Sequence, residues 1–294
     1  MEPPRHDVPE GGRSGFTVVD GRQIHYLEWG PSRGPVVLCL HGGGQTAYMF
    51  EDLGAALRER YHVIAIDLPD HGDSDPGSGY GRTDIAATLP SFCDHFGLDR
   101  MAIVGASLGG MVAITLAAAQ PERVGAIVLI DVGHRLEDEG VNRIIEFMSA
   151  HESFGSLQEA AAEIAPYLPH RKSVRPERLR RNLRQRDDGR WVWKHGFSRA
   201  LRERPDHEWV NWRELVAGLD EDAAGLRCPV LILRGDASDV LSSEGAQEIS
   251  DLIPDARLAI VKNAGHLAAG DNPDSTVNLI ASFLAEIGWR GDGS

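Results

Sequence analysis

The sequence predicts an α/β protein: a doubly wound, mostly parallel sheet of the α/β type, with a helical cap inserted after the sixth strand. Three observations lead to this prediction. Strand-like and helix-like segments alternate, most strand-like segments are continuously apolar, and one long insertion breaks the alternation. Continuous apolar runs are typical of strands buried on both faces of a parallel sheet. With 294 residues, 42% of them hydrophobic, the chain can form one large core domain with an insertion.

Eight segments have the pattern of strands. The first two, residues 15–20 and 22–30, meet at Asp20-Gly21, a dipeptide that favours a tight hairpin turn. Six apolar runs follow: PVVLCL, YHVIAID, MAIVGA, VGAIVLID, CPVLILRG and ARLAIVK. Helix-like stretches such as FEDLGAALRER and MVAITLAAAQ separate most of these runs, which favours right-handed crossovers between parallel strands.

The insertion lies between the VLID and PVLILRG runs, which are about 95 residues apart, far more than a crossover needs. We therefore expect a helical cap at residues 135–217, a core domain formed by 15–134 and 218–294, and a flexible N-terminus at 1–14. Between Arg171 and Arg204 there are 13 Lys and Arg but only 4 Asp and Glu. These positive charges either form a solvated face that is salt-bridged to the acidic core or attract an anionic substrate group.

The overall composition excludes several classes of protein. A formal net charge of −14 argues against non-specific binding to nucleic acid. The start MEPPRHDVPEGGRSG lacks the apolar segment of a secretory signal, and no stretch reaches the roughly 18 apolar residues of a membrane span. The three cysteines, Cys39, Cys93 and Cys228, have no metal-like spacing. We expect a cytoplasmic protein with no metal or other cofactor and no nucleic-acid or membrane partner; a homodimer is compatible with the sequence.

The stretch VGASLGGMVA places Ser107 between Gly105 and Gly109, where an apolar strand meets a helix. A sharp turn at this junction would force Ser107 into a strained backbone conformation and expose its hydroxyl at the carboxyl edge of the sheet. The two glycines would remove side chains that otherwise collide. GxSxG spacing alone is a weak signal in a glycine-rich chain, so the flanking strand and helix carry the prediction that Ser107 is a nucleophile.

A serine nucleophile needs a base that is oriented by a third group. His266 is the candidate base, because it lies in the glycine-containing loop NAGHLAAG between the last strand and the final helix. Asp239 is the preferred acid, since three residues of loop after the strand ending in RGD let its carboxylate reach toward His266. Asp236 is interpreted as a turn residue, and Asp131, at the end of VLID, stays a third candidate for the acid.

The tract HGGG after the third strand supplies backbone N–H groups that can approach a ligand closely. We expect the N–H of Gly43, with that of Gly44 as an alternative, and the N–H of Leu108 to form an oxyanion hole. Leu108 also opens a helix, so its N–H is free and the helix dipole favours negative charge there. HGGG lacks the spacing of the glycine-rich phosphate-binding motifs, which makes nucleotide binding a poor alternative.

In this order and spacing, HGGG, DLPDHGDSD, GASLGG, RGDASD and NAGH resemble the motifs of the α/β-hydrolase superfamily. The resemblance extends from Gly15 to about Ile287 and implies the order of nucleophile, acid and base seen here. It also implies a cap after the sixth strand. One departure is Asp70, where members of the superfamily usually carry glycine before His71.

The resemblance implies a hydrolase, and Ser107 argues against the dehalogenase and epoxide hydrolase branches, which use an aspartate nucleophile. Ala106 and Leu267 differ from the asparagine and tryptophan usual in serine hydrolases that cleave carbon–carbon bonds. We therefore expect hydrolysis of a small-molecule ester or lactone through an acyl-enzyme. A carbon–carbon bond hydrolase, a cofactor-free perhydrolase, a lyase and a non-catalytic ligand receptor remain alternatives.

The substrate pocket is the least defined part of the prediction. Tyr48, just beyond the glycine tract, and Trp193 of the cap are candidate pocket residues together with Gly44. The four cap tryptophans, Trp191, Trp193, Trp209 and Trp212, either line a hydrophobic pocket or form a small core of the cap.

Overall fold

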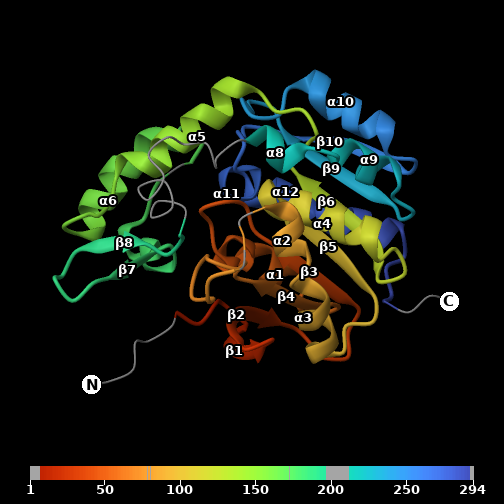
Figure 1. Ribbon diagram of the computed structural model, residues 1–294, viewed down its shortest axis with the longest axis horizontal. Helices are drawn as coiled ribbons and strands as arrows, with labels where there is room; N and C mark the ends of the chain where they lie inside the picture. Colours follow the sequence, from red (N-terminus) through yellow and green to blue (C-terminus); the bar gives the residue numbers. More distant parts are fainter. Residues whose placement is uncertain (1–6, 78, 80, 172, 197–211, 292–294) are drawn as a thin grey trace.

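The computed structural model describes residues 7–77, 79, 81–171, 173–196 and 212–291. Its centre is an eight-stranded sheet with the order β1-β2-β4-β3-β5-β6-β9-β10 (Figure 1). The sheet strands are β1 (Arg13–Val19), β2 (Arg22–Trp29), β3 (Val36–Leu40), β4 (His62–Ile66), β5 (Met101–Ala106), β6 (Val124–Ile130), β9 (Val230–Gly235) and β10 (Ala256–Val261). They coincide with the eight segments that the sequence predicts.

The six sheet strands β3, β4, β5, β6, β9 and β10 run parallel to one another, whereas β2 pairs antiparallel with both β1 and β4. Asp20 and Gly21 both have positive φ, 51° and 77°, which suits the tight β1–β2 hairpin that their sequence predicts. Because the six parallel strands point the same way, the residues that follow them meet at one edge of the sheet. This edge carries His41, Asp67, Ser107 and Asp131 directly after β3, β4, β5 and β6.

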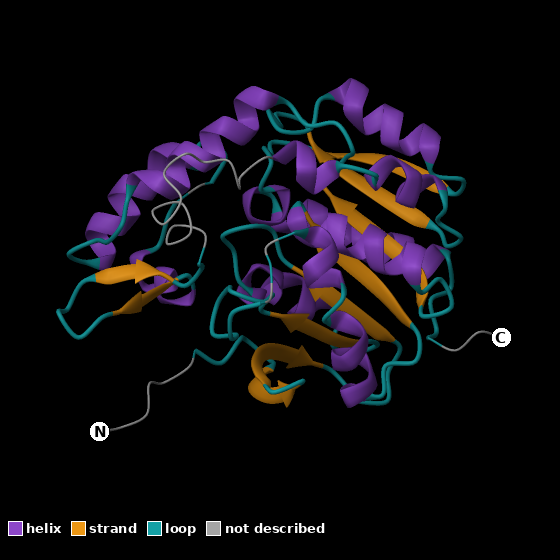
Figure 2. Ribbon diagram, in the orientation of Figure 1, coloured by secondary structure: helices purple, strands orange, loops and turns teal. Residues whose placement is uncertain are grey.

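Helices cover both faces of the sheet (Figure 2). One face packs against α2, α3, α4, α9 and α10, and the other against α1, α11 and α12. These helices are α1 (Glu51–Leu57), α2 (Arg82–Ala86), α3 (Leu89–Phe96), α4 (Leu108–Ala119), α9 (Leu219–Ala224), α10 (Ser243–Leu252), α11 (Ala268–Asp271) and α12 (Pro273–Glu286), and the short 3-10 helix η1 (Ala47–Phe50) precedes α1. Burial of continuously apolar strands between two helical layers accounts for the stability of the core.

The insertion between β6 and β9 extends to one side of the core (Figure 1). It contains α5 (Asp138–Ala150), α6 (Leu157–Ile164), η2 (Ala165–Tyr167), η3 (Pro176–Arg181), β7 (Leu183–Gln185), β8 (Trp191–Trp193) and α8 (Trp212–Val216). We call residues 138–216 the cap. Its own hydrophobic cluster is centred on Phe154, Leu157 and Leu183.

The cap, which the sequence predicts to be helical, contains α5, α6 and α8 and also an antiparallel hairpin of β7 and β8. Gly189 makes its turn possible with a φ of 83°, and three-residue strands are too short to give a recognisable sequence pattern. Trp191 and Trp193 pack against the cap cluster, as the core interpretation of the tryptophans expects. Trp209 and the cations Lys172, Arg199, Arg202 and Arg204 lie outside the described residues.

Residues 7–12, which the sequence assigns to a flexible N-terminus, make hydrogen bonds to the core. The backbone N–H of Glu10 donates to the Glu51 carboxylate at 3.0 Å, and the Trp29 indole N–H donates to the Glu10 carbonyl at 3.0 Å. Strand β1 then begins at Arg13.

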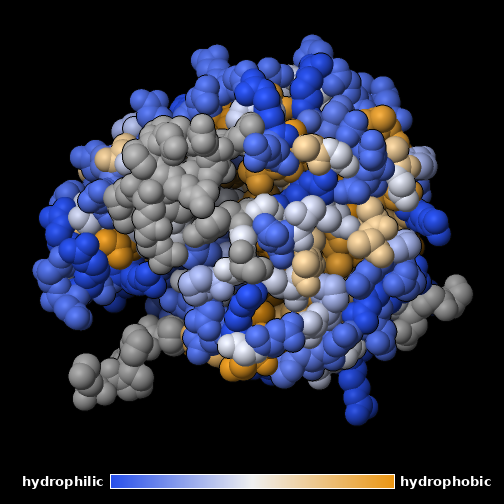
Figure 3. Space-filling view, viewed as in Figure 1, coloured by the Kyte–Doolittle hydropathy of each residue, from blue (hydrophilic) through white to orange (hydrophobic). Residues whose placement is uncertain are grey.

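No helix within the described ranges is both long and apolar enough to cross a membrane. The face shown in Figure 3 is mostly hydrophilic, with small, separate hydrophobic patches.

Candidate active site

Ser107 occupies the sharp turn between β5 and α4 that the sequence predicts. Its backbone angles, φ 46° and ψ −117°, are strained for a residue with a side chain. A Cβ on Gly105 would lie 2.5 Å from the Gly109 carbonyl oxygen, and one on Gly109 would overlap the carbonyl oxygen of Leu40. Both glycines are therefore needed for the close approach of α4 to the strands. The partly exposed Ser107 hydroxyl makes no hydrogen bond with the described residues.

His266 lies at the same edge, held by the carboxylate of Asp131. The two side chains are joined by a 3.0 Å hydrogen bond between His266 Nδ1 and Asp131 Oδ1. Asp131 is fully buried and follows β6, the strand next to that of Ser107, and the Ser107 N–H bonds to the Ile130 carbonyl at 3.0 Å. Asp131 and Ser107 therefore occupy neighbouring strand ends.

Three donors surround the Asp131 carboxylate. Oδ1 accepts the Ser238 hydroxyl at 2.6 Å as well as His266, and Oδ2 accepts the Gly235 N–H at 2.9 Å. Because Asp131 Oδ1 accepts the Ser238 hydroxyl, it is also the acceptor in its hydrogen bond with the imidazole. Nδ1 of His266 is therefore the donor. The lone pair of the neutral ring then lies on Nε2, where a base needs it.

Asp239, the preferred acid from sequence, does not contact His266. Its carboxylate forms a 2.7 Å ion pair with Arg143 of α5 and is 30% exposed. The loop after β9 turns the Ser238 hydroxyl toward Asp131 and directs Asp239 toward the cap instead. Asp236 accepts the Ala264 N–H at 3.2 Å, which agrees with its interpretation as a turn residue. The third sequence candidate, Asp131, is the one that the structure joins to His266.

The HGGG loop packs directly against Ser107. A Cβ on Gly42 would lie 3.3 Å from Ser107 Cβ, whereas around Gly43 there is open space. The N–H of Gly42 is occupied, since it donates to Gln45 Oε1 at 2.9 Å. Within the described part of the chain, the N–H groups of Gly43 and Leu108 have no hydrogen-bond partner, so both can bind an anionic oxygen.

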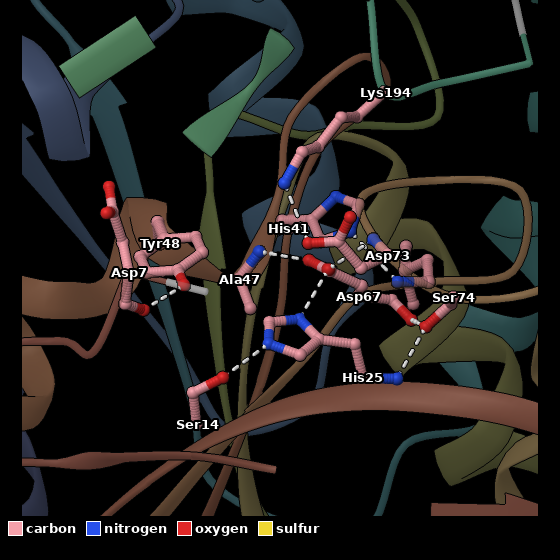
Figure 4. Close-up of polar contacts among 11 residues, drawn as sticks. Asp7, Ser14, His25, His41, Ala47, Tyr48, Asp67, Asp73, Ser74 and Lys194 are labelled. Carbon is pink, nitrogen blue, oxygen red and sulfur yellow. Dashed lines mark hydrogen bonds and ion pairs between the residues drawn. The ribbon is translucent and has the colours of Figure 1, made fainter. Parts of the chain in front are cut away.

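His41 and Asp67 form hydrogen bonds with the backbone of this glycine loop and of the residues next to it. His41 is fully buried: its Nδ1–H donates to the Gly42 carbonyl at 2.8 Å and its Nε2 accepts the Leu68 N–H at 2.9 Å. Burial lowers the pKa of His41 to about 3, so the ring is neutral. Asp67 accepts the Ala47 N–H at 2.7 Å just beyond the glycines (Figure 4).

Figure 4 also shows the buried pair of Asp67 and His25, which is joined by a 2.6 Å hydrogen bond. Although burial opposes ionisation, the hydrogen bond from His25 lowers the pKa of Asp67. His25, Asp67 and Asp73 are the one group in the described residues whose potential metal-ligating atoms lie within 4.8 Å of one another. Lys194 Nζ already pairs with Asp73 Oδ2 at 2.7 Å, and Asp67 already binds His25, so the group fits an internal hydrogen-bond network better than a metal site.

The cap covers the glycine loop with Met148 and His195. A Cβ on Gly44 would lie 2.6 Å from the Met148 methyl carbon and 3.5 Å from His195 Nε2. His195 stacks on Trp193, with ring centroids 5.4 Å apart, and burial lowers its pKa to about 3. Gly44 thus lies against Met148 and His195, and Trp193 contacts His195, so that both stay candidate pocket residues.

Tyr48, the remaining candidate pocket residue, has other contacts. It is buried; its hydroxyl donates to the Asp7 carbonyl, and the Arg181 guanidinium lies 4.9 Å from its ring centroid. These contacts place Tyr48 in the packing between the N-terminal segment and the cap, and its role as a pocket residue stays a prediction.

The cap cations near the core are paired with carboxylates. The ion pairs that join the two parts include Lys194 with Asp73 at 2.7 Å, Arg143 with Asp239 at 2.7 Å, Arg181 with Glu51 at 2.8 Å, and Arg171 with Asp271 at 3.5 Å. This favours the interpretation of the basic region as a surface salt-bridged to the acidic core. A backbone hydrogen bond also connects the cap with the core, since the Gly196 N–H donates at 2.9 Å to the carbonyl of Asp70. Asp70 itself has a φ of 63°, a conformation that favours glycine.

A fold of this kind, with a serine on a strained strand-to-helix turn at the sheet edge, defines the class of α/β hydrolases. The model of the alpha/beta hydrolase fold family matches residues 35–273, most of the sequence, and the chain belongs to this family.

The chain is similar to two characterised bacterial proteins. It is 30% identical to "Esterase Rv0045c" of Mycobacterium tuberculosis over 90% of this chain and 88% of the relative. It is 28% identical to "2-(acetamidomethylene)succinate hydrolase" of Mesorhizobium japonicum over 85% of this chain and 88% of the relative. A crystal structure of esterase Rv0045c matches with a TM-score of 0.72, 28% identity and coverage of 93% and 91% of the two chains. The family and these relatives support a hydrolase.

Proposed function

We propose that the protein is a serine hydrolase that cleaves uncharged small-molecule carboxylic esters, including lactones, through an acyl-enzyme. The observation that carries the proposal is the 3.0 Å hydrogen bond between His266 Nδ1 and Asp131 Oδ1 at the strand end next to Ser107. It orients a neutral imidazole with Nε2 available as a base. Ser107 supplies the nucleophile, His266 the base and Asp131 the acid.

In the proposed reaction, Ser107 Oγ attacks the ester carbonyl carbon while its proton passes to Nε2 of His266. The N–H groups of Gly43 and Leu108 bind the oxygen that becomes negative, and Asp131 stabilises the imidazolium. Collapse of the tetrahedral intermediate breaks the bond to the alcohol oxygen, which takes the proton from His266. Water, deprotonated by the same histidine, then attacks the acyl carbon. The bond to Ser107 Oγ breaks, Oγ takes the proton back from His266, and the acid is released.

An uncharged substrate is favoured by the charge of the residues around the glycine loop. His41 and His195 are neutral, because burial lowers the pKa of each to about 3. Lys194 and Arg143 are engaged in ion pairs with Asp73 and Asp239. A substrate carboxylate would have to compete with these protein carboxylates. The Mesorhizobium relative is named for a succinate, which is a dicarboxylate, so we expect this chain to differ from it in substrate.

Hydrolysis of p-nitrophenyl esters of graded acyl length tests the proposal. We expect Ser107→Ala to lower kcat by about a thousandfold or more. Ser149→Ala is the matched control, because Ser149 is exposed on α5 and bonds only to carbonyls of its own helix. Absence of Ser107-dependent hydrolysis across esters, lactones and carbon–carbon ring-fission substrates would refute the proposed function.

The same assay tests the charge of the substrate. We expect p-nitrophenyl butyrate to have a kcat/KM at least about tenfold above that of mono-p-nitrophenyl succinate, which has the same acyl chain length and an added carboxylate. A tenfold preference corresponds to about 1.4 kcal/mol. A preference for the succinate ester would contradict the proposed substrate class and leave the role of Ser107 intact.

A further inference from the structure

The loop after β9 is wrapped around a buried guanidinium. The Arg234 side chain donates from Nε to the Leu241 carbonyl at 2.7 Å and from Nη2 to the Ser238 carbonyl at 3.2 Å. A third, longer hydrogen bond of 3.5 Å runs from Nη1 to the Asp236 carbonyl. Since the donors of a guanidinium lie in a rigid plane, they fix the relative positions of the carbonyls they bind. Arg234 therefore sets the course of the backbone around Ser238.

The backbone of this loop also orients the Ser238 hydroxyl. Ser238 Oγ accepts the N–H of Val240 at 3.3 Å and the N–H of Leu241 at 3.2 Å, and it lies 2.6 Å from Asp131 Oδ1. A hydroxyl has one proton and two lone pairs. With two amides donating to the oxygen, its proton is left for Asp131.

We propose that Ser238 is a positioning residue for the catalytic pair of Asp131 and His266, an inference that rests on the proposed function. Its hydroxyl binds Oδ1, the same carboxylate oxygen that binds His266 Nδ1. The hydrogen bond fixes the rotation of the Asp131 carboxylate and takes up part of the negative charge on Oδ1. It thereby sets both the direction and the strength with which Asp131 holds the imidazole.

Loss of the Ser238 hydroxyl should change the pH dependence of kcat/KM, which a packing defect alone would not change. With one donor fewer, Oδ1 keeps more negative charge and stabilises protonated His266 more strongly. The acidic limb of the pH profile of kcat/KM should therefore move to higher pH, because His266 must be neutral to act as a base. A loss of packing alone would lower the rate equally across the profile.

The test compares Ser238→Ala with Ser242→Ala in the full chain. Ser242 lies in the same segment, but its hydroxyl accepts the Gly245 N–H at the start of α10 and does not contact Asp131. We expect Ser238→Ala to lower kcat about tenfold, to change KM by less than about twofold, and to shift the acidic limb to higher pH. Ser242→Ala should leave kcat and the pH profile unchanged. Ser238→Thr, which keeps the hydroxyl, should recover most of the rate.

A second readout requires no substrate: the proton NMR resonance of the His266 Nδ1–H that is hydrogen-bonded to Asp131. It should move in Ser238→Ala and stay in place in Ser242→Ala. Ser238→Cys keeps the volume but is a weak donor, and it replaces the alanine variant if that variant does not fold. A Ser238→Ala or Ser238→Cys protein with the wild-type resonance overturns the inference. Absence of Ser107-dependent hydrolysis together with a shifted resonance overturns the proposed function alone.

Discussion

Two neutral, buried histidines, His41 of the core and His195 of the cap, should make the protein sensitive to mild acid. Burial lowers the pKa of His41 and of His195 from 6.5 to about 3, so the folded protein resists protonation that the unfolded chain accepts. Because the folded pKa is depressed, the unfolded state binds more protons below about pH 6.5. Stability is therefore lost as the pH falls from about 6.5 toward 3.

The size of this loss follows from proton linkage. Between pH 7.5 and pH 5.0, an imidazole with a pKa of 6.5 when unfolded and about 3 when folded lowers the free energy of unfolding by about 2 kcal/mol. His41 and His195 together contribute about 4 kcal/mol. The hydrogen-bonded Asp67 does not offset this loss, because its pKa is lowered and its contribution falls only at more acidic pH.

Urea unfolding at pH 7.5 and pH 5.0, followed by circular dichroism, measures the effect for the wild type and His195→Gln. The variant should lose about 2 kcal/mol less between the two pH values than the wild type loses. His95→Gln makes the same exchange at an exposed position and serves as the matched control. An equal pH dependence for the wild type and His195→Gln would refute the argument that the folded protein holds His195 neutral.

Three further predictions concern the proposed catalytic acid, the turn at Ser107 and the ion pairs of the cap. Asp131→Asn should lower kcat for p-nitrophenyl acetate by about 10³- to 10⁴-fold, whereas Asp239→Asn should change it by less than about threefold; the reverse order would restore Asp239 as the acid. Gly109→Ala should lower the free energy of unfolding by about 3 kcal/mol, measured in urea, because its methyl group overlaps a carbonyl oxygen of β3. Lys194→Ala should cost about 2 kcal/mol by removing the ion pair with the largely buried Asp73, while Arg186→Ala, which breaks an exposed pair, should cost less than about 0.5 kcal/mol; equal losses would contradict this.

The sequence identifies the strands, and singles out Ser107 as the proposed nucleophile, because these signals are local. Each parallel strand is a continuous apolar run, and Ser107 stands between a strand and a helix with glycines at the positions where side chains would collide. His266 is the candidate base because the order of the motifs leaves one histidine in the loop after the last strand. These features need no knowledge of distant contacts.

The choice of acid depends on contacts that the sequence does not display. Both Asp131 and Asp239 follow strands that end near His266, so strand order alone allows either. Contacts of the loop after β9 separate the two candidate acids. Arg234 binds backbone carbonyls of this loop, and Arg143, almost 100 residues earlier in the chain, pairs with Asp239. Asp131 did carry one signal: it directly ends the strand beside that of Ser107, with no loop residues between.

Backbone strain at the sheet edge leads to a last prediction about Ser107. Four non-glycine residues with positive φ follow parallel strands: Asp70, Ser107, Asp131 and Asn263. Such conformations cost about 1–3 kcal/mol each and persist where the surroundings enforce them, often at functional sites. Ser107→Ala and Ser107→Gly both remove the hydroxyl, but only alanine keeps the Cβ that strains the turn.

We therefore expect Ser107→Gly to be more stable than Ser107→Ala by about 1 kcal/mol in urea unfolding, although glycine elsewhere costs about 0.5–1 kcal/mol relative to alanine. Both variants should lack hydrolytic activity, so the comparison separates strain from chemistry. If the alanine variant is the more stable one, the turn does not strain its central residue. In that case the conformation at Ser107 is a preference of the local sequence, and the free energy of folding is not being used to hold the nucleophile in place.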